Sequence, residues 1–293
     1  LRKTVVDEVE DPDEQMLPEE AARYVKNPKV GDVVDIQLET KQFGRIAAQT
    51  AKHVIRQGIR EAERGQQMQE FQRRNQELVT ALVTRVDPKS GAATLEFGKA
   101  EAVLPKSEQI GEEELHEGDR IKVYVVDVRE GEKGPRALIS RTHPGLVKRL
   151  FEMEVPEIFN GVVEIKAVSR EAGSRTKLAV QAHDENVDAV GACIGPRGAR
   201  VAGIVDELGG GKIDIVEYSD EPEKFIAAAL SPAKVLSVEV DPDGAKSCRA
   251  TVPDSQLSLA IGNKGQNARL AAKLTGWKID IRPESGFYGE EDA

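Results

Sequence analysis

Two short segments of the sequence have the residue types needed to hold a phosphate backbone. They are Gly195-Pro196-Arg197-Gly198 and Gly262-Asn263-Lys264-Gly265. Glycine at both ends permits positive φ and leaves no Cβ to block a phosphate group. The N-terminus of the helix that follows favours an anion, and Arg197 or Lys264 can contact phosphate directly. The sequence therefore predicts two clamps for a sugar-phosphate chain.

The surroundings of the two loops add detail to this prediction. Pro196 lacks an N–H group, so contacts at the first loop are expected to be weaker or differently shaped than at the second, where Asn263 can donate. Bases are expected to lie in an apolar groove between helix and sheet, where their edges are read without stacking. Four further basic residues are candidates for phosphate contacts: Arg200, Arg269, Lys273 and Lys278.

The loops belong to an internal duplication. The offset of 67 residues between Gly195 and Gly262 becomes 66 between Lys212 and Lys278, and Lys-Ile-Asp-Ile occurs in both copies. A single Gly-x-x-Gly is more often a plain turn between helices, but its repetition in the same context favours RNA binding.

Each copy reads as helix, two strands, helix, loop, helix and strand. This order resembles the type II KH domain, whose loop clamps about four nucleotides. The ranges expected before the loops are 146–151, 162–168 and 177–181 in the first copy, and 223–230, 235–240 and 248–252 in the second.

Residues 77–141 predict a small barrel. Five runs rich in β-branched residues are separated by turn residues, and they occupy 78–86, 92–97, 100–104, 121–128 and 136–140. Five strands in so short a segment suit an OB-fold, and the segment resembles the S1-type RNA-binding domain. Its candidate RNA face is Phe97, Tyr124 and Arg141, although such a barrel can also be a rigid spacer.

The N-terminal part predicts a short helix around 19–24, a strand at 33–38 and a long helix from about 42 to 76. An apolar stripe runs along the long helix at three- and four-residue spacing, from Phe43 to Ala62. Another face carries Lys52, Arg56, Arg60 and Arg64. This face is either solvated, or it docks a partner or faces RNA, and the pattern leaves both open.

Composition limits the class of protein. The 293 residues carry a net charge of −10, and no stretch is apolar enough to span a membrane. The acidic residues lie mainly at the two ends of the chain: the net charge is −6 over residues 1–40 and −4 over the tail from 283. In contrast, the net charge is +5 over residues 41–75 and +2 over 221–282. The net acidity is expected to discourage indiscriminate polyanion binding and to leave affinity to the shaped clamps.

No catalytic or cofactor chemistry is predicted. Cys193 and Cys248 are expected to be buried, reduced thiols of a cytosolic protein, and the four histidines are scattered without metal-ligand spacing. Phosphate-loop, Gly-x-Ser-x-Gly and His-Glu-x-x-His motifs are absent from the sequence. We expect no enzyme, no metal and no cofactor.

Taken together, these motifs resemble one family, the NusA family of bacterial transcription factors. The segments that carry the resemblance are 49–52, 60–64, 187–195, 207–210, 257–262 and 274–280. The resemblance implies an α+β multi-domain chain: a partial N-terminal polymerase-binding domain (1–75), an S1-type OB-fold barrel (76–142), two type II KH domains (143–220 and 221–284) and an acidic tail (285–293).

The same resemblance implies a non-catalytic cytoplasmic factor that modulates pausing, termination and antitermination. Its implied partners are single-stranded nascent RNA, RNA polymerase and other Nus-type antitermination factors, without a membrane, and the chain is expected to be a monomer. The missing initiating Met and the lack of acidic repeats predict a chain without the first part of the N-terminal domain and without a C-terminal autoinhibitory region. The alternative is a KH-containing ribosomal or ribosome-assembly protein.

Overall fold

The computed structural model describes residues 1–37, 45–98, 100–111, 113–131, 134–241 and 246–286, with side chains from residue 49 onward in the long helix. The chain forms two compact units, Leu1–Glu63 and Arg64–Ala293, and each is described by itself. The four domain boundaries expected from the sequence stay predictions.

The first unit contains a small three-stranded sheet. Strand β1 (Arg2–Val5) lies between β2 (Gln15–Met16), which is parallel to it, and β3 (Val33–Asp35), which is antiparallel. Helix α1 (Pro18–Ala21) follows β2, and Val5, Met16, Ala21 and Val34 form the core. The predicted helix and strand are therefore present but shorter than expected.

Helix α2 (Arg45–Arg73) is the predicted long helix, and it ends three residues earlier than expected. The side chains of Val54, Ile55 and Ile59 in its predicted apolar stripe are exposed, whereas Phe71 near its end is buried. Phe43 lies outside the described residues. Between Val54 and Ile59 the apolar stripe therefore packs against no hydrophobic core of the described residues.

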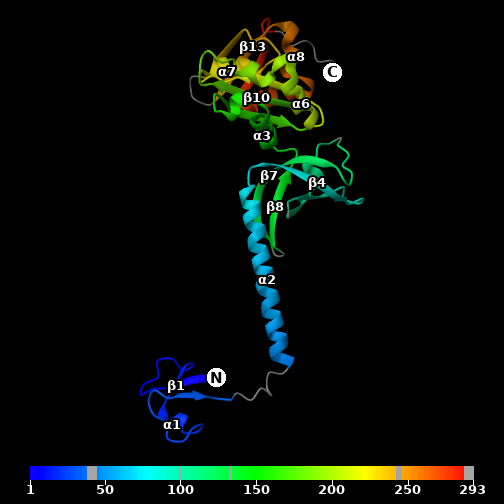
Figure 1. Ribbon diagram of the computed structural model, residues 1–293. Coiled ribbons are helices and arrows are strands. Elements are labelled where there is room, and N and C mark those ends of the chain that lie inside the picture. Colours follow the sequence, from blue (N-terminus) through cyan, green and yellow to red (C-terminus); the bar gives the residue numbers. More distant parts are fainter. Residues whose placement is uncertain (38–44, 99, 112, 132–133, 242–245, 287–293) are drawn as a thin grey trace. The chain divides into compact units, whose positions relative to one another are not determined.

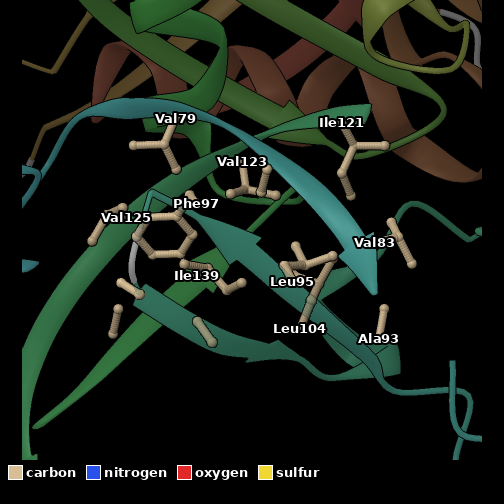
Figure 2. Packing of buried hydrophobic residues seen from close by; sticks show 14 of the residues in the cluster. Val79, Val83, Ala93, Leu95, Phe97, Leu104, Ile121, Val123, Val125 and Ile139 are labelled. Carbon is tan, nitrogen blue, oxygen red and sulfur yellow. The ribbon is translucent and has the colours of Figure 1, made fainter. Parts of the chain in front are cut away.

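The second unit begins with the predicted barrel (Figure 1). Its five antiparallel strands pair in the order β6-β5-β4-β7-β8, and β6 also contacts β8, so the sheet nearly closes as in an OB-fold. Alternating residues point inward and form one core with Phe71, as Figure 2 shows for Val79, Leu95, Phe97 and Val123. The strands are β4 (Leu78–Val86), β5 (Ala93–Phe97), β6 (Ala100–Leu104), β7 (Arg120–Gly131) and β8 (Gly134–Ser140).

Two copies of the predicted KH order follow. In each, the middle strand is antiparallel to the first strand and parallel to the last, giving sheet orders β11-β10-β9 and β12-β13-β14. This is the type II arrangement. The first copy comprises α3 (Pro144–Glu154), α4 (Pro156–Phe159), β9 (Val163–Glu171), β10 (Arg175–Ala182), α5 (Ala189–Ile194), α6 (Ala199–Glu207) and β11 (Lys212–Glu217). The second comprises α7 (Pro222–Ala229), β12 (Ser237–Val240), β13 (Ser247–Val252), α8 (Leu257–Ile261), α9 (Gln266–Thr275) and β14 (Lys278–Pro283).

The two copies share a core. Ala179 and Val216 of the first sheet pack in one apolar cluster with Phe225, Ile226 and Ala271 of the second copy. Polar contacts also cross this interface: the hydroxyl of Ser169 donates to the carbonyl of Leu270 at 2.8 Å. The first sheet is thus covered on one face by its own helices and on the other by helices of the second copy.

The barrel joins the first copy through a buried charge cluster. Arg141 pairs with Glu113 at 2.6 Å and with Glu207 at 3.6 Å, and donates to the carbonyl of Glu207 at 3.0 Å. Beside it, Arg170 donates to the carbonyl of Arg141 at 2.7 Å, and burial, together with the charge of Arg141, lowers the pKa of Arg170 to about 10. This cluster fixes the end of α6 against the barrel.

Candidate nucleic-acid interface

The two predicted clamps have nearly the same backbone. Gly195 and Gly262 have φ of 72° and 78° with ψ near 175° and 171°, and Gly198 and Gly265 are left-handed with φ of 75° and 71°. The positive φ predicted at the end glycines is therefore present in both loops.

The basic residue inside each loop is also left-handed, which sequence reasoning did not anticipate. Arg197 has φ of 55° and Lys264 has φ of 49°. A non-glycine residue pays roughly 1–2 kcal/mol for this conformation, and such strain is typical of functional sites. The turn carries both side chains into solvent, where neither forms a hydrogen bond or ion pair with a described residue. They are free to meet a phosphate.

The first and last glycines of each loop have different tasks. A Cβ on Gly195 would lie 2.5 Å from Cγ of Arg200, and a Cβ on Gly262 would lie 2.8 Å from the backbone nitrogen of Asn267. A Cβ on Gly198 would meet nothing within 4 Å, and one on Gly265 would meet Nη1 of Arg269 at 3.6 Å. The first glycine is needed because neighbouring protein atoms occupy the space that a Cβ would fill, whereas the last glycine leaves an open surface that a ligand can approach.

Arg200 braces the first loop. Its Nη1 donates to the carbonyl of Ala192 at 2.6 Å and to Oε2 of Glu157 at 3.0 Å, while its stem covers Gly195. Its side chain is 26% exposed. The guanidinium thus binds residues of α5 and α4. The structure therefore places this predicted RNA contact beneath the loop and not on its surface.

Asn267 has the same place in the second loop, five residues after the first glycine. Its Nδ2 donates to the carbonyls of Ala260 at 2.9 Å and Leu230 at 3.1 Å, and its side chain is fully buried. The sequence analysis missed this residue, although the offset of 67 between Arg200 and Asn267 is the signal that pairs them. One loop is therefore braced by a charged pair and the other by a neutral amide.

Arg269 joins the second loop to the first KH copy. It donates to the carbonyl of Lys264 and pairs with Oε1 of Glu171 at 2.9 Å. Gln266, at the start of α9, donates to Oε2 of Glu171 and to the hydroxyl of Ser174, both at 2.8 Å. The bond from Gln266, followed by that from Arg269, holds the pKa of Glu171 below its usual value despite partial burial. The second loop is therefore braced from both copies.

Lys273 and Lys278 lie away from the second loop. Helix α9 has 10 residues and a length of about 15 Å, so Lys273 in its last turn is two turns from the loop. Lys278 opens β14 beyond the end of the helix. The phosphate contacts expected for these two residues stay predictions.

The prediction of an exposed RNA face on the barrel is wrong, because its three residues are buried. Phe97 is 2% exposed and packs inside the barrel against Phe71, with the rings tilted by 53° and their centroids 5.8 Å apart. Tyr124 is buried against the first KH copy, its ring parallel to that of His143 at 5.0 Å. Arg141 is held by Glu113 and Glu207. None of the three has a free surface on which a base can stack.

The basic face of α2 is exposed as predicted. Lys52, Arg56, Arg60 and Arg64 all lie in the described part of the helix with their side chains in solvent, four residues apart and hence along one face.

The described residues were also compared with the needs of thiol chemistry, metal binding and membrane insertion. Burial raises the pKa of Cys193 to about 12 and that of Cys248 to about 11, so both thiols are unreactive. Within the ranges that the structure describes, no three His, Cys, Asp or Glu side chains gather in a way that could hold a metal. In those ranges no helix has the length and apolar character to cross a bilayer.

Two type II KH folds with exposed Gly-x-x-Gly loops, preceded by an S1-type barrel, define a multi-domain RNA-binding protein. Family models agree segment by segment: the NusA N-terminal domain matches residues 1–65, the S1 RNA binding domain 74–140, the NusA-like first KH domain 141–218 and the NusA-like second KH domain 222–288. The chain belongs to the NusA family.

Similar curated proteins carry the name transcription termination/antitermination protein NusA. That of Bacillus subtilis is 55% identical over 99% of this chain and 79% of its own length. The protein of Halalkalibacterium halodurans is 54% identical over 97% of this chain and 74% of its own length. The protein of Thermus thermophilus is 46% identical over 94% of this chain and 71% of its own length. A solved structure described as "Crystal structure of APE1850" is 26% identical over 46% of this chain and 95% of that one, at a TM-score of 0.36, which is too low to support an argument.

Proposed function

We propose that the chain is a non-catalytic transcription factor that binds nascent single-stranded RNA and RNA polymerase in the cytoplasm and modulates pausing, termination and antitermination. The observation that carries the RNA part is the pair of loops, each with an unpartnered basic side chain and an open last glycine. The family supplies the transcription part, since its curated members are named for termination and antitermination.

The RNA site of this proposal consists of the two loops and the residues that shape them. Arg197, Lys264 and the backbone from Gly195 to Gly198 and from Gly262 to Gly265 contact the sugar-phosphate chain. Ile194 and Ile261, each partly exposed just before its loop, supply apolar surface for the adjoining bases. Arg200, Asn267 and Arg269 keep the loops in position.

The test is the double variant Gly198→Asp and Gly265→Asp. A Cβ on Gly198 meets nothing within 4 Å and one on Gly265 meets only Nη1 of Arg269, at 3.6 Å. Asp tolerates the left-handed conformation better than most residues, so the chain is expected to fold. A carboxylate at each clamp repels phosphate, and we expect at least a hundredfold loss of affinity in an RNA titration. The matched control is Gly276→Asp, because Gly276 has a similar φ of 74° and open surroundings but lies at the other end of α9. A folded double variant that binds RNA as tightly as the control contradicts the RNA part of the proposal.

The polymerase part rests on the N-terminal unit and the exposed basic face of α2. Reversal of Lys52, Arg56 and Arg60 to Glu is expected to weaken co-purification with RNA polymerase while sparing RNA affinity. Co-purification with ribosomal particles instead of polymerase would favour the alternative of a ribosomal or ribosome-assembly protein. A loss of RNA affinity in this variant would show that the helix belongs to the RNA site.

A further inference from the structure

Glu171 lies at the end of β9 in the first KH copy, and both oxygens of its carboxylate bind helix α9 of the second copy. Oε1 accepts from Arg269, at 2.9 Å from Nη2 and 3.2 Å from Nε, and Oε2 accepts from Nε2 of Gln266 at 2.8 Å. Gln266 and Arg269 are three residues apart at the start of α9 and therefore share one face of its first turn. The carboxylate thus gathers the two long side chains that follow the second Gly-x-x-Gly loop.

Arg269 connects this carboxylate to the strained residue of the second loop. Its guanidinium donates through Nη1 to the carbonyl of Lys264, while Glu171 holds Nη2 and Nε. Lys264 has a left-handed backbone, with φ of 49° and ψ of 32°. A non-glycine residue keeps such a conformation only where surrounding contacts fix it. One guanidinium therefore carries a restraint from the first KH copy to the residue that presents the basic side chain of the loop.

The residues after the first loop cannot make the same connection. The offset of 67 residues between the two loops places Ala199 where the second copy has Gln266. It places Ala202 where the second copy has Arg269. A methyl side chain forms no hydrogen bond, so neither alanine can hold the carbonyl of Arg197. The external restraint therefore belongs to the second loop, whose helix α9 contacts β9 of the first copy.

Contacts other than those of Glu171 hold α9 on the first copy. The hydroxyl of Ser169 donates to the carbonyl of Leu270 at 2.8 Å, and Ala179 packs in one apolar cluster with Ala271 of α9. Ser169 is 3% exposed, whereas the side chain of Glu171 is 27% exposed, so the carboxylate lies at the rim of the interface. Removal of the carboxylate is therefore expected to leave the two copies docked and to release the loop alone.

We propose that Glu171 is a positioning residue of the second clamp, so that the loop from Gly262 to Gly265 binds RNA at full strength only while α9 is docked on the first KH copy. This inference rests on the proposed function, since it requires RNA on that loop. The second clamp is then a composite of both copies. By thermodynamic linkage, RNA on the second loop also strengthens the docking of the two copies.

The experiment is a titration of the full chain with a fluorescein-labelled pool of 12-nucleotide random-sequence RNA, in the Gly198→Asp background that leaves the second clamp to bind. Glu171→Ala is expected to weaken binding about fivefold, the scale of one exposed ion pair and one hydrogen bond to a charged group. Glu171→Gln keeps an acceptor and is expected to lose less. The matched control is Glu164→Ala, which removes a 2.7 Å ion pair with Lys166 near the other end of β9 and is expected to leave affinity unchanged.

Three further measurements separate positioning from a general loss of stability. In the Gly265→Asp background, where the second clamp is disabled, Glu171→Ala is expected to weaken RNA binding no further. In a double-mutant cycle, Glu171→Ala with Arg269→Ala is expected to bind no more weakly than Arg269→Ala alone, because Glu171 acts on the loop through the guanidinium. Without RNA, hydrogen exchange at the amide of Gly265, which donates to the carbonyl of Gly262 at 3.1 Å, is expected to be faster in Glu171→Ala and unchanged in Glu164→Ala.

Tighter RNA binding by Glu171→Ala overturns the proposal, because the carboxylate then withholds Arg269 from phosphate instead of positioning it. Unchanged affinity of folded Glu171→Ala, while Gly265→Asp weakens binding, also overturns it and leaves the proposed function standing. RNA affinity that resists both clamp substitutions, Gly198→Asp and Gly265→Asp, instead refutes the proposed function.

Discussion

Arg200 and Glu157 are joined by a 3.0 Å ion pair that connects the helix after the first Gly-x-x-Gly loop to α4, 43 residues earlier in the chain. The corresponding place in the second loop is taken by the buried amide of Asn267. The two clamps therefore share a backbone and differ in how they are held. Salt screens the attraction within an ion pair that solvent reaches, and it hardly changes the hydrogen bonds of a buried amide.

Glu157→Gln is expected to weaken RNA binding through the first clamp by about two- to fivefold. The substitution keeps a hydrogen-bond acceptor and removes the charge, and a pair at this exposure is worth roughly 0.2–1 kcal/mol. The measurement is an RNA titration in the Gly265→Asp background, which isolates the first clamp. Glu239→Gln is the control, since it removes an exposed pair with Arg249 on the second sheet. Equal affinities for the two variants contradict the bracing role of Glu157.

Alanine substitutions at three of the loop glycines are expected to differ in how much stability they cost. Gly198→Ala and Gly265→Ala meet no close protein backbone, so each is expected to cost about 1–2 kcal/mol for the left-handed backbone alone. Gly262→Ala adds a clash with the backbone nitrogen of Asn267 and is expected to cost clearly more than either. The free energy of unfolding in urea measures this order, and an equal cost at all three positions contradicts it.

Phe97→Ala is expected to destabilise the barrel by about 3–5 kcal/mol, because the ring is buried beside Phe71 and leaves a cavity. The RNA affinity of the folded fraction is expected to stay unchanged, since the ring has no surface. Urea unfolding and RNA titration of the same variant measure the two effects, with Phe97→Leu as the milder control. A loss of RNA affinity in folded Phe97→Leu would restore Phe97 to the RNA site.

Local sequence patterns determine some elements of this chain and leave others to long-range contacts. The barrel strands and both KH orders were predictable because alternation, turn residues and a repeated motif are local signals; β4 and β6 have the predicted bounds. The role of Arg200 was not predictable, because its partner Glu157 lies 43 residues away. The sequence predicts a free surface at Tyr124, but the first KH copy covers the ring, and no local pattern in the barrel indicates that contact.

Lowering the pH is expected to destabilise the second unit through His143. This residue caps α3: its Nδ1 accepts from the backbone N–H of Gly145 at 3.0 Å, which requires an unprotonated Nδ1. Burial, followed by the charge of Arg170, lowers the pKa of His143, and Glu108 opposes this shift. Because the folded pKa lies below the unfolded value, the stabilisation is present above about pH 6.5 and decreases as the pH falls through that value toward the folded pKa.

The variant His143→Asn isolates this effect, since Asn caps a helix as well and does not titrate. We expect the free energy of unfolding in urea to fall more steeply between pH 7.5 and 5.5 for the wild type than for His143→Asn. The other three histidines contribute equally to both proteins and cancel in the difference. Parallel pH profiles would show that the cap at Gly145 does not depend on the protonation of His143.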